Sequence, residues 1–229
     1  MAVHTPLDSR VHHAVLRSIV DHGHAPTARE LADGLAVAPG DAIASLRRLH
    51  DNHGLVLHPG TSEVWIAHPF SLSPTAVWVD DGARGWWAPC LWCAFGVQAV
   101  IGAAVTITVR IGGETETVAI RADEGGVDIG YIAHFPMPPR HAWDNVVHFC
   151  ASLLPFRSER DLDAWCARHR QPRGAALSLP ALQTLARLWY GRHLATDWVK
   201  WTPAEAAEIF AAAGLVGDFW SINPTALRF

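Results

Sequence analysis

Two cysteines that stand three positions apart near the middle of the chain are the first residues that could do chemistry. Cys90 and Cys93 lead into a run of small and apolar residues, 94 to 104, which is typical of a helix. Thiols at the start of a helix are favoured as thiolates, because free backbone N–H groups and the helix dipole stabilise negative charge there. The pair could therefore be a redox couple, half of a zinc site, or two buried thiols.

The other two cysteines differ in their surroundings. Residues 145 to 152 are a strand candidate, and a strand that begins at Trp143 would place Asp144, Val146, His148 and Cys150 on one face. Cys150 could thus approach the pair, or it could be a small buried hydrophobic residue, as free cysteine often is. Cys166 falls at helical spacing with apolar neighbours, which predicts a place in the core.

Composition limits the class of protein. Four cysteines in 229 residues are too few for a disulfide scaffold, and no stretch approaches the roughly 20 apolar residues of a membrane span. The N-terminus lacks the charged-then-apolar layout of a signal peptide, so a cytoplasmic protein with reduced thiols and no membrane partner is expected. The formal net charge of −4 provides no general attraction to nucleic acid.

The first 70 residues are predicted to form a winged-helix-like domain. Apolar spacing and capping signals predict helices over 9–22, from Thr27 to Leu35, and after Pro39, followed by a β-hairpin over 55–66. Such a domain could bind DNA through its third helix, which carries Arg47 and Arg48. This segment contains five arginines but seven acidic residues, however, so its net charge is negative. We therefore expect this domain to have a structural role or to form a homodimer rather than to bind nucleic acid.

The remainder of the chain, residues 75 to 229, is predicted to form a second domain after a linker over 69–74. Its strands are expected at 76–79, 105–110, 115–120 and 127–133, and its helices at 159–170, 178–192 and 203–213. Because strands and helices do not alternate as in a parallel βαβ fold, we predict an α+β fold, a mixed sheet with flanking helices and a helical C-terminal part.

Several segments of this second domain resemble the alkylmercury lyase family. They are the run from Gly85 to Val97 with its Cys-Leu-Trp-Cys centre, His134-Phe135-Pro136, the run from Trp143 to Cys150, and the run from Phe156 to Cys166. The resemblance covers about residues 75 to 220, and the family also carries a winged-helix-like N-terminal region. It implies cleavage of a carbon–mercury bond by protonolysis, in which two soft thiolates bind the metal and an aspartate supplies the proton.

The resemblance also implies roles for individual residues. Cys90 matches the family's first cysteine and Cys150 the second, whereas Cys93 stands where the family's aspartate is expected. In other members the second cysteine would align near Asp144, so the Cys, Asp, Cys order would become Cys90, Cys93, Asp144. We therefore predict Cys90 and Cys150 as principal thiols and metal ligands, Cys93 as an assisting ligand, and Asp144 as the acid.

A small-molecule substrate is expected in an aromatic pocket near these thiols. Its predicted lining residues are Trp87, Trp92, His134, Trp143 and His148, although each histidine could instead be structural. No resident cofactor is expected, because Hg(II) or another soft metal would be substrate and product. Two alternatives stay open. The protein could bind or sense a soft metal without cleavage, with the winged helix as output, or it could be a biosynthetic enzyme built on the same scaffold.

Overall fold

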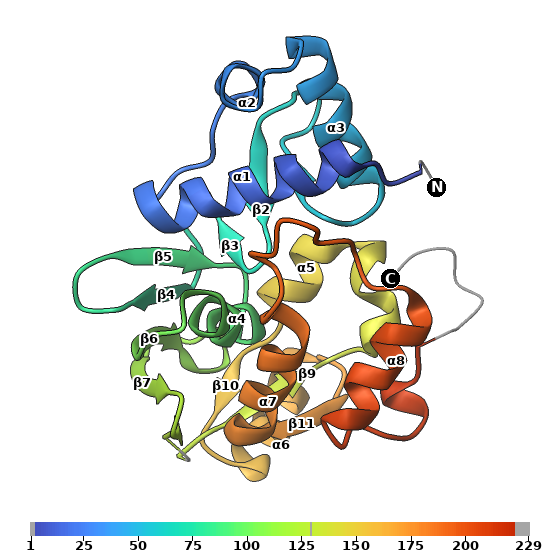
Figure 1. Ribbon diagram of the computed structural model, residues 1–229. Helices are drawn as coiled ribbons and strands as arrows, with labels where there is room; N and C mark the ends of the chain where they lie inside the picture. The colour runs from blue at the N-terminus through green and yellow to red at the C-terminus, as the bar shows by residue number, and fades with distance from the viewer. Residues whose placement is uncertain (1–2, 129, 223–229) are drawn as a thin grey trace.

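Three helices form the N-terminal part of the computed structural model, which describes residues 3–128 and 130–222 (Figure 1). They are α1 (Pro6–His22), α2 (Ala28–Leu35) and α3 (Pro39–Asp51). Thr27 and Glu30 form the predicted capping box, and Gly23, at φ 77°, ends α1. The three predicted helices are confirmed, whereas the winged-helix character of this region stays a prediction.

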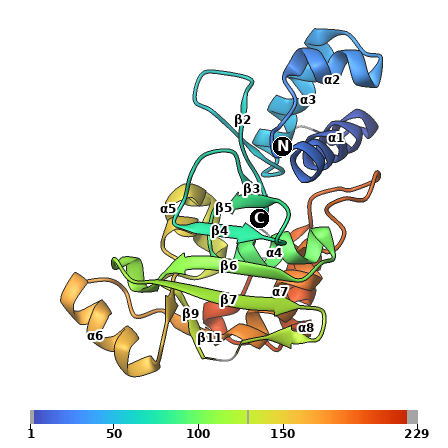
Figure 2. The ribbon, with the colours of Figure 1, turned by 90° about the vertical axis from the view of Figure 1, so that its left-hand side faces the viewer.

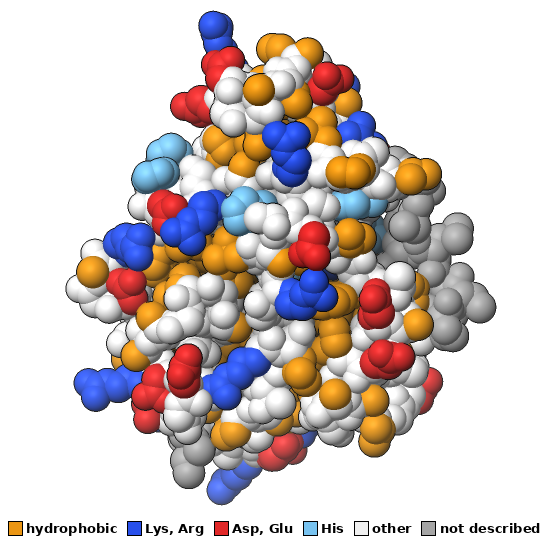
Figure 3. Space-filling view, in the orientation of Figure 1, with side chains coloured by type: hydrophobic (Ala, Val, Ile, Leu, Met, Phe, Trp, Pro, Cys, Tyr) orange, Lys and Arg blue, Asp and Glu red, His pale blue; other side chains and the backbone are white. Residues whose placement is uncertain are grey.

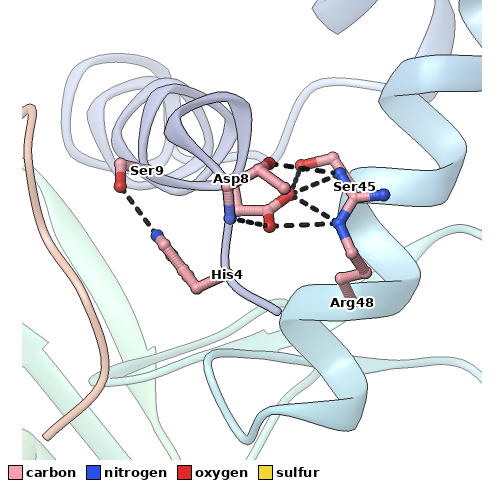
Figure 4. Close-up of polar contacts among 6 residues, drawn as sticks. His4, Asp8, Ser9, Ser45 and Arg48 are labelled. Atoms are coloured by element: carbon pink, nitrogen blue, oxygen red, sulfur yellow. Dashed lines mark hydrogen bonds and ion pairs between the residues drawn. The ribbon is translucent and has the colours of Figure 1, made fainter. Parts of the chain in front are cut away.

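A buried ion pair joins α1 to α3 (Figure 4). Asp8 is fully buried, and its carboxylate accepts hydrogen bonds from Arg48 at 2.7 Å and from the Ser45 hydroxyl at 2.6 Å. Burial raises the pKa of Asp8, but the hydrogen bonds from Arg48, Ser45 and Thr5 outweigh it and lower that pKa below its ordinary value. Arg48 is thus engaged inside the domain, which leaves the candidate recognition helix poorer in free positive charge.

One antiparallel sheet runs from the N-terminal part into the rest of the molecule. Its strand order is β1-β2-β3-β5-β4-β6-β7-β8. The strands are β1 (Val56–Leu57), β2 (Val64–Ala67), β3 (Phe70–Ser71), β4 (Val77–Asp80), β5 (Gly85–Ala88), β6 (Val105–Arg110), β7 (Thr117–Asp123) and β8 (Gly126–Val127). The predicted linker is partly wrong, because β3 lies within it and pairs with both β2 and β5. Fully buried Phe70 explains why this segment is ordered.

A smaller sheet and five further α-helices follow among the described residues. The sheet has the order β10-β9-β11, from β9 (Ile132–Phe135), β10 (Pro155–Phe156) and β11 (Ala175–Ser178). The helices are α4 (Leu91–Ile101), α5 (Val146–Ala151), α6 (Glu159–His169), α7 (Leu179–Tyr190) and α8 (Pro203–Ala212). The strand predicted over 127–133 is divided between β8 and β9, and residue 129 lies outside the described residues. Residues 1–2 of the first predicted domain and residues 223–229 of the second also lie outside the described residues.

Helix α4 lies at the centre of the core, between the large sheet and α7 (Figures 1 and 2). Its residues from Leu91 to Gln98 are all buried, which accounts for a sequence that is apolar on every side. Gly96 permits close packing, because a Cβ atom there would lie 2.4 Å from the ring of Tyr190 on α7. The α+β prediction is confirmed, and this packing fixes the N-terminus of α4.

The segment from Val146 to Ala151 is a helix, so the strand predicted over 145–152 is wrong. Asn145 caps α5 by accepting a hydrogen bond from the backbone N–H of His148 at 3.0 Å. Ser152 closes the other end by donating to the carbonyl oxygen of His148 at 2.8 Å. The β-branched residues Val146 and Val147 do not favour a helix. These two hydrogen bonds stabilise its ends nevertheless.

The distribution of charged side chains on the surface agrees with the low formal net charge. Lys and Arg side chains are interspersed with Asp and Glu over the face in Figure 3, without a broad basic area. Within the part of the chain that the structure describes, no helix is long and apolar enough to cross a membrane.

Candidate functional site

Cys90 and Cys93 occupy the first turn of α4, as predicted. Cys90 is the N-cap residue, and its Sγ atom accepts a hydrogen bond from the backbone N–H of Cys93 at 3.3 Å. Both side chains are buried, and both are free thiols. A sulfur at the N-cap receives the partial positive charge of the helix N-terminus, which favours its thiolate form.

Cys150 reaches the pair from α5. It lines one cavity together with Cys93 and a second one together with Cys90, and both cysteines shift its pKa, so the three thiols lie close together. Its Sγ atom also lies 3.9 Å from Nε2 of His68. The ligand atoms of His68, Cys93 and Cys150 lie within 4.8 Å of one another, a spacing that one metal ion could bridge.

The three thiols are not electrostatically equivalent. Burial raises the pKa of Cys90, but hydrogen bonds from Cys150, Cys93 and backbone N–H groups hold it well below its ordinary value. Burial and the interaction with Cys90 raise the pKa of Cys93 well above its ordinary value. The pKa of Cys150 is also raised well above it, first by its hydrogen bond to Cys90. Cys90 is therefore the thiol of the cluster that loses its proton most readily, whereas Cys93 and Cys150 favour the protonated form.

A small cavity of about 40 Å³ opens beside Cys93 and Cys150. Tyr190 shares a hydrogen bond with Cys93, at 3.4 Å between Oη and Sγ. Lys200 also lines this cavity, and its Nζ atom lies 5.2 Å from the ring centroid of Trp143 and 5.3 Å from that of Trp189. Burial lowers the pKa of Lys200 to about 7.

His68, Tyr190 and Lys200 were not among the predicted site residues. Lys200 did carry a signal, since it is the only lysine in the sequence and stands between Trp198 and Trp201. A single lysine among large aromatic residues indicates a half-buried charge with a specific position. His68 and Tyr190 carry no comparable local signal.

The predicted pocket residues divide into two groups. Trp92 and Trp143 line the small cavity beside the thiols. Trp87 lines neither cavity at the thiols, because its ring packs edge-on against Trp78 at 4.7 Å. His134 is fully buried elsewhere, where its Nε2 donates to the carbonyl oxygens of Pro172 and Arg173. His148 is exposed on α5. Neither histidine lines a cavity at the thiols.

Asp144 is not brought to the thiols. It ends the 3-10 helix η2 (Pro139–Asp144), its side chain is 77% exposed, and it accepts a hydrogen bond from His141 at 3.0 Å. The predicted strand face shared with Cys150 does not exist, because α5 begins immediately after Asn145. Among the described residues, no Asp or Glu lines either cavity at the thiols. Cys166, by contrast, lies in a separate apolar cluster, as predicted.

A mixed α/β fold that gathers three buried thiols around a helix N-terminus defines a protein suited to soft metals. A family model described as "MerB: Alkylmercury lyase" matches residues 70–191, more than half of the sequence. The chain therefore belongs to the alkylmercury lyase family, and the family and fold support an organomercurial-lyase-like function on a small molecule.

A solved structure has a similar fold. It is described as the crystal structure of the mercury-bound form of MerB2, and it superposes with a TM-score of 0.65 at 18% sequence identity. The match covers 84% of this chain and 91% of that chain, so the likeness extends over almost the whole fold. No curated protein matches the chain.

Proposed function

We propose that this protein cleaves the bond between carbon and mercury, or a related soft metal, in a small organometallic substrate. The observation that carries the proposal is the convergence of Cys90, Cys93 and Cys150 at the buried N-terminus of α4. Thiolate is the preferred ligand of a soft metal, and a second thiol raises the electron density on the departing carbon.

Cys90 is the first ligand in this proposal. It is the thiol that hydrogen bonds and the helix N-terminus favour as a thiolate, so it can attack the metal of the substrate without first losing a proton. Cys150 follows as the second ligand. It lies in the wall of the same cavity as Cys90, whose interaction with it shifts its pKa, so it is within reach of a metal already bound at Cys90.

The proton for the departing carbon comes from Cys150 itself. Its thiol is protonated in the free protein and becomes acidic when its sulfur binds the metal. The carbon–mercury bond and the S–H bond break, while a C–H bond and a second sulfur–mercury bond form. The products are a hydrocarbon and a mercury dithiolate, with no oxidant or reductant. Cys93, hydrogen-bonded to Tyr190, assists as a third thiol in place of the family's aspartate.

The test is release of benzene from phenylmercuric acetate in the presence of excess small thiol. Wild-type protein should release benzene over many turnovers, and Cys90→Ser should lose that activity, because a hydroxyl is neither a soft ligand nor ionised at neutral pH. Cys166→Ser is the matched control, since Cys166 is also buried but belongs to a separate cluster. Equal loss in both variants, or none in Cys90→Ser, would refute the proposal.

Soft-metal binding without cleavage is the second candidate function. It is favoured by the His68, Cys93 and Cys150 group, whose ligand atoms fit around one ion without any carboxylate. In that case mercury would be taken up in proportion to protein while its organic group stayed attached. The same benzene assay separates the two functions.

A further inference from the structure

A second cavity, larger than the one beside Cys93, meets the thiol cluster. Its volume is about 260 Å³, and Cys90 and Cys150 are both part of its wall. These two cysteines are almost fully buried, whereas Pro74, Ala76 and Ala151 on the same wall are exposed. The cavity thus leads from solvent to the two sulfur atoms that the proposed function assigns to the metal.

The lining of this cavity is apolar. It includes the side chains of Trp65, Ile66, Val77, Val147, Leu153 and Leu154. Three hydroxyl residues line it, and two of their hydroxyl groups are already engaged, because Ser71 donates to the carbonyl oxygen of Ser73 at 2.8 Å and Thr75 to that of Ala88 at 2.6 Å. Among the described residues, no Asp, Glu, Lys, Arg or His side chain lines it, so the Cys90 sulfur is the one group in its wall that is favoured as an anion. Such a wall favours a hydrocarbon group over water or a polar ligand.

The two cavities differ in what they can hold. An apolar cavity of about 150 Å³ in another protein binds benzene, so about 260 Å³ has room for an aryl group. The cavity beside Cys93 has about 40 Å³, which is close to the space of one water molecule. The organic part of a substrate bound at Cys90 therefore has space on one side of the cluster only.

We propose that the larger cavity is the subsite for the organic group of the substrate, and that it selects aryl or bulky alkyl groups over methyl. This inference rests on the proposed function for the identity of the attached metal. A phenyl group would fill much of the cavity and be removed from water, whereas a methyl group would leave most of it empty. Trp65 offers an aromatic ring for packing against an aryl substrate.

The test compares two substrates in variants that narrow the cavity. Ala151→Phe should lower kcat/KM for phenylmercuric acetate by about tenfold, the scale on which apolar pockets discriminate size, and leave methylmercuric chloride unchanged. Ala76→Phe narrows the cavity from a different segment and should give the same pattern. Both positions are exposed, so the added ring does not disturb the core. Ala167→Phe, at an exposed position of α6, is the control. Equal loss for both substrates, or no loss, would overturn the inference.

A metal-free ligand separates this inference from the proposed function. Binding of chlorobenzene, followed by ligand-observed NMR, should be seen with the wild type and with Ala167→Phe, and should be lost in Ala151→Phe. This result would support the cavity as an aryl site even if neither mercurial released hydrocarbon, an outcome that would refute only the lyase. A wild type that does not bind chlorobenzene would overturn the inference, whatever its activity.

Discussion

The Sγ atom of Cys150 lies 3.9 Å from Nε2 of His68, a residue of the segment that joins β2 to β3. Burial lowers the pKa of His68 to about 3, so its ring is neutral at neutral pH and can offer a lone pair to a metal. His68 thereby completes a group of ligands with Cys93 from α4 and Cys150 from α5.

His68→Phe should weaken retention of Hg(II) after cleavage. If the imidazole is a ligand of the product, its loss should lower the affinity by roughly tenfold, about 1.4 kcal/mol. The change is measured by adding a chelating dithiol as competitor and determining how much mercury stays bound to the protein. His22→Phe is the control, because His22 is exposed on α1 and is not one of these ligands. Identical retention in wild type and His68→Phe would show that His68 takes no part in holding the metal.

Cys93→Asp should increase hydrocarbon release relative to Cys93→Ala. An aspartate at this position restores the residue that the resemblance to the family implies, and burial would raise its pKa and keep it protonated as a proton donor. The hydrogen-bonding Tyr190 hydroxyl is already in place. Initial rates of benzene release from phenylmercuric acetate measure the effect. Cys93→Asp that is no faster than Cys93→Ala would mean that Cys150 alone supplies the proton.

Lys200→Met should stabilise the protein most at pH 7 and below. Burial lowers the pKa of Lys200 from 10.5 to about 7, so between these values the unfolded chain binds more protons than the folded one. Burying Lys200 therefore lowers the free energy of unfolding by its full amount below pH 7. This destabilisation becomes smaller as pH rises across the window. Urea unfolding of both proteins from pH 7 to 10 tests this. The advantage of Lys200→Met should shrink as pH rises, and an advantage independent of pH would contradict the assignment.

His12→Phe should reduce the sensitivity of the protein to acid. The ring of His12 is fully buried, stacks on Trp198 at 3.6 Å, and has no hydrogen-bond partner among the described residues. Burial lowers its pKa from 6.5 to about 3. The unfolded chain binds more protons between these values, so the free energy of unfolding falls as pH falls through that window.

Urea midpoints at pH 7 and pH 5 measure this effect. The loss on acidification should be smaller in His12→Phe than in the wild type, and some loss should persist because His68 and His193 also have lowered pKa values. Exposed His22→Phe is the control. An equal loss in His12→Phe and the wild type would show that His12 does not remain neutral in the folded protein.

Much of the fold could be predicted from local patterns. The helices from Thr27 and Thr202 begin at capping boxes, and Cys90 caps α4 as its position before an apolar run indicates. Helix α5 could not be predicted in this way, because its valines favour a strand, and only the side-chain hydrogen bonds made by Asn145 and Ser152 at its two ends favour a helix.

The site was only partly predictable for a different reason. Cys90 and Cys93 are neighbours in sequence, but Tyr190 reaches Cys93 only because Gly96 lets α7 pack closely on α4. Lys200 likewise reaches the same cavity from a segment far along the chain. Such contacts depend on tertiary packing, which one sequence does not reveal. Asp144 shows the converse, since its apparent proximity to Cys150 depended on a strand that does not form.

The most direct test of the account is a single turnover without added thiol. Phenylmercuric acetate is mixed with an excess of wild-type protein, and benzene and protein-bound mercury are measured in the same samples. Cleavage by the thiol cluster predicts equal amounts of both, with mercury that no longer carries a phenyl group. Mercury that stays bound to the protein with its phenyl group attached, and no benzene, would contradict cleavage and leave a soft-metal binding protein.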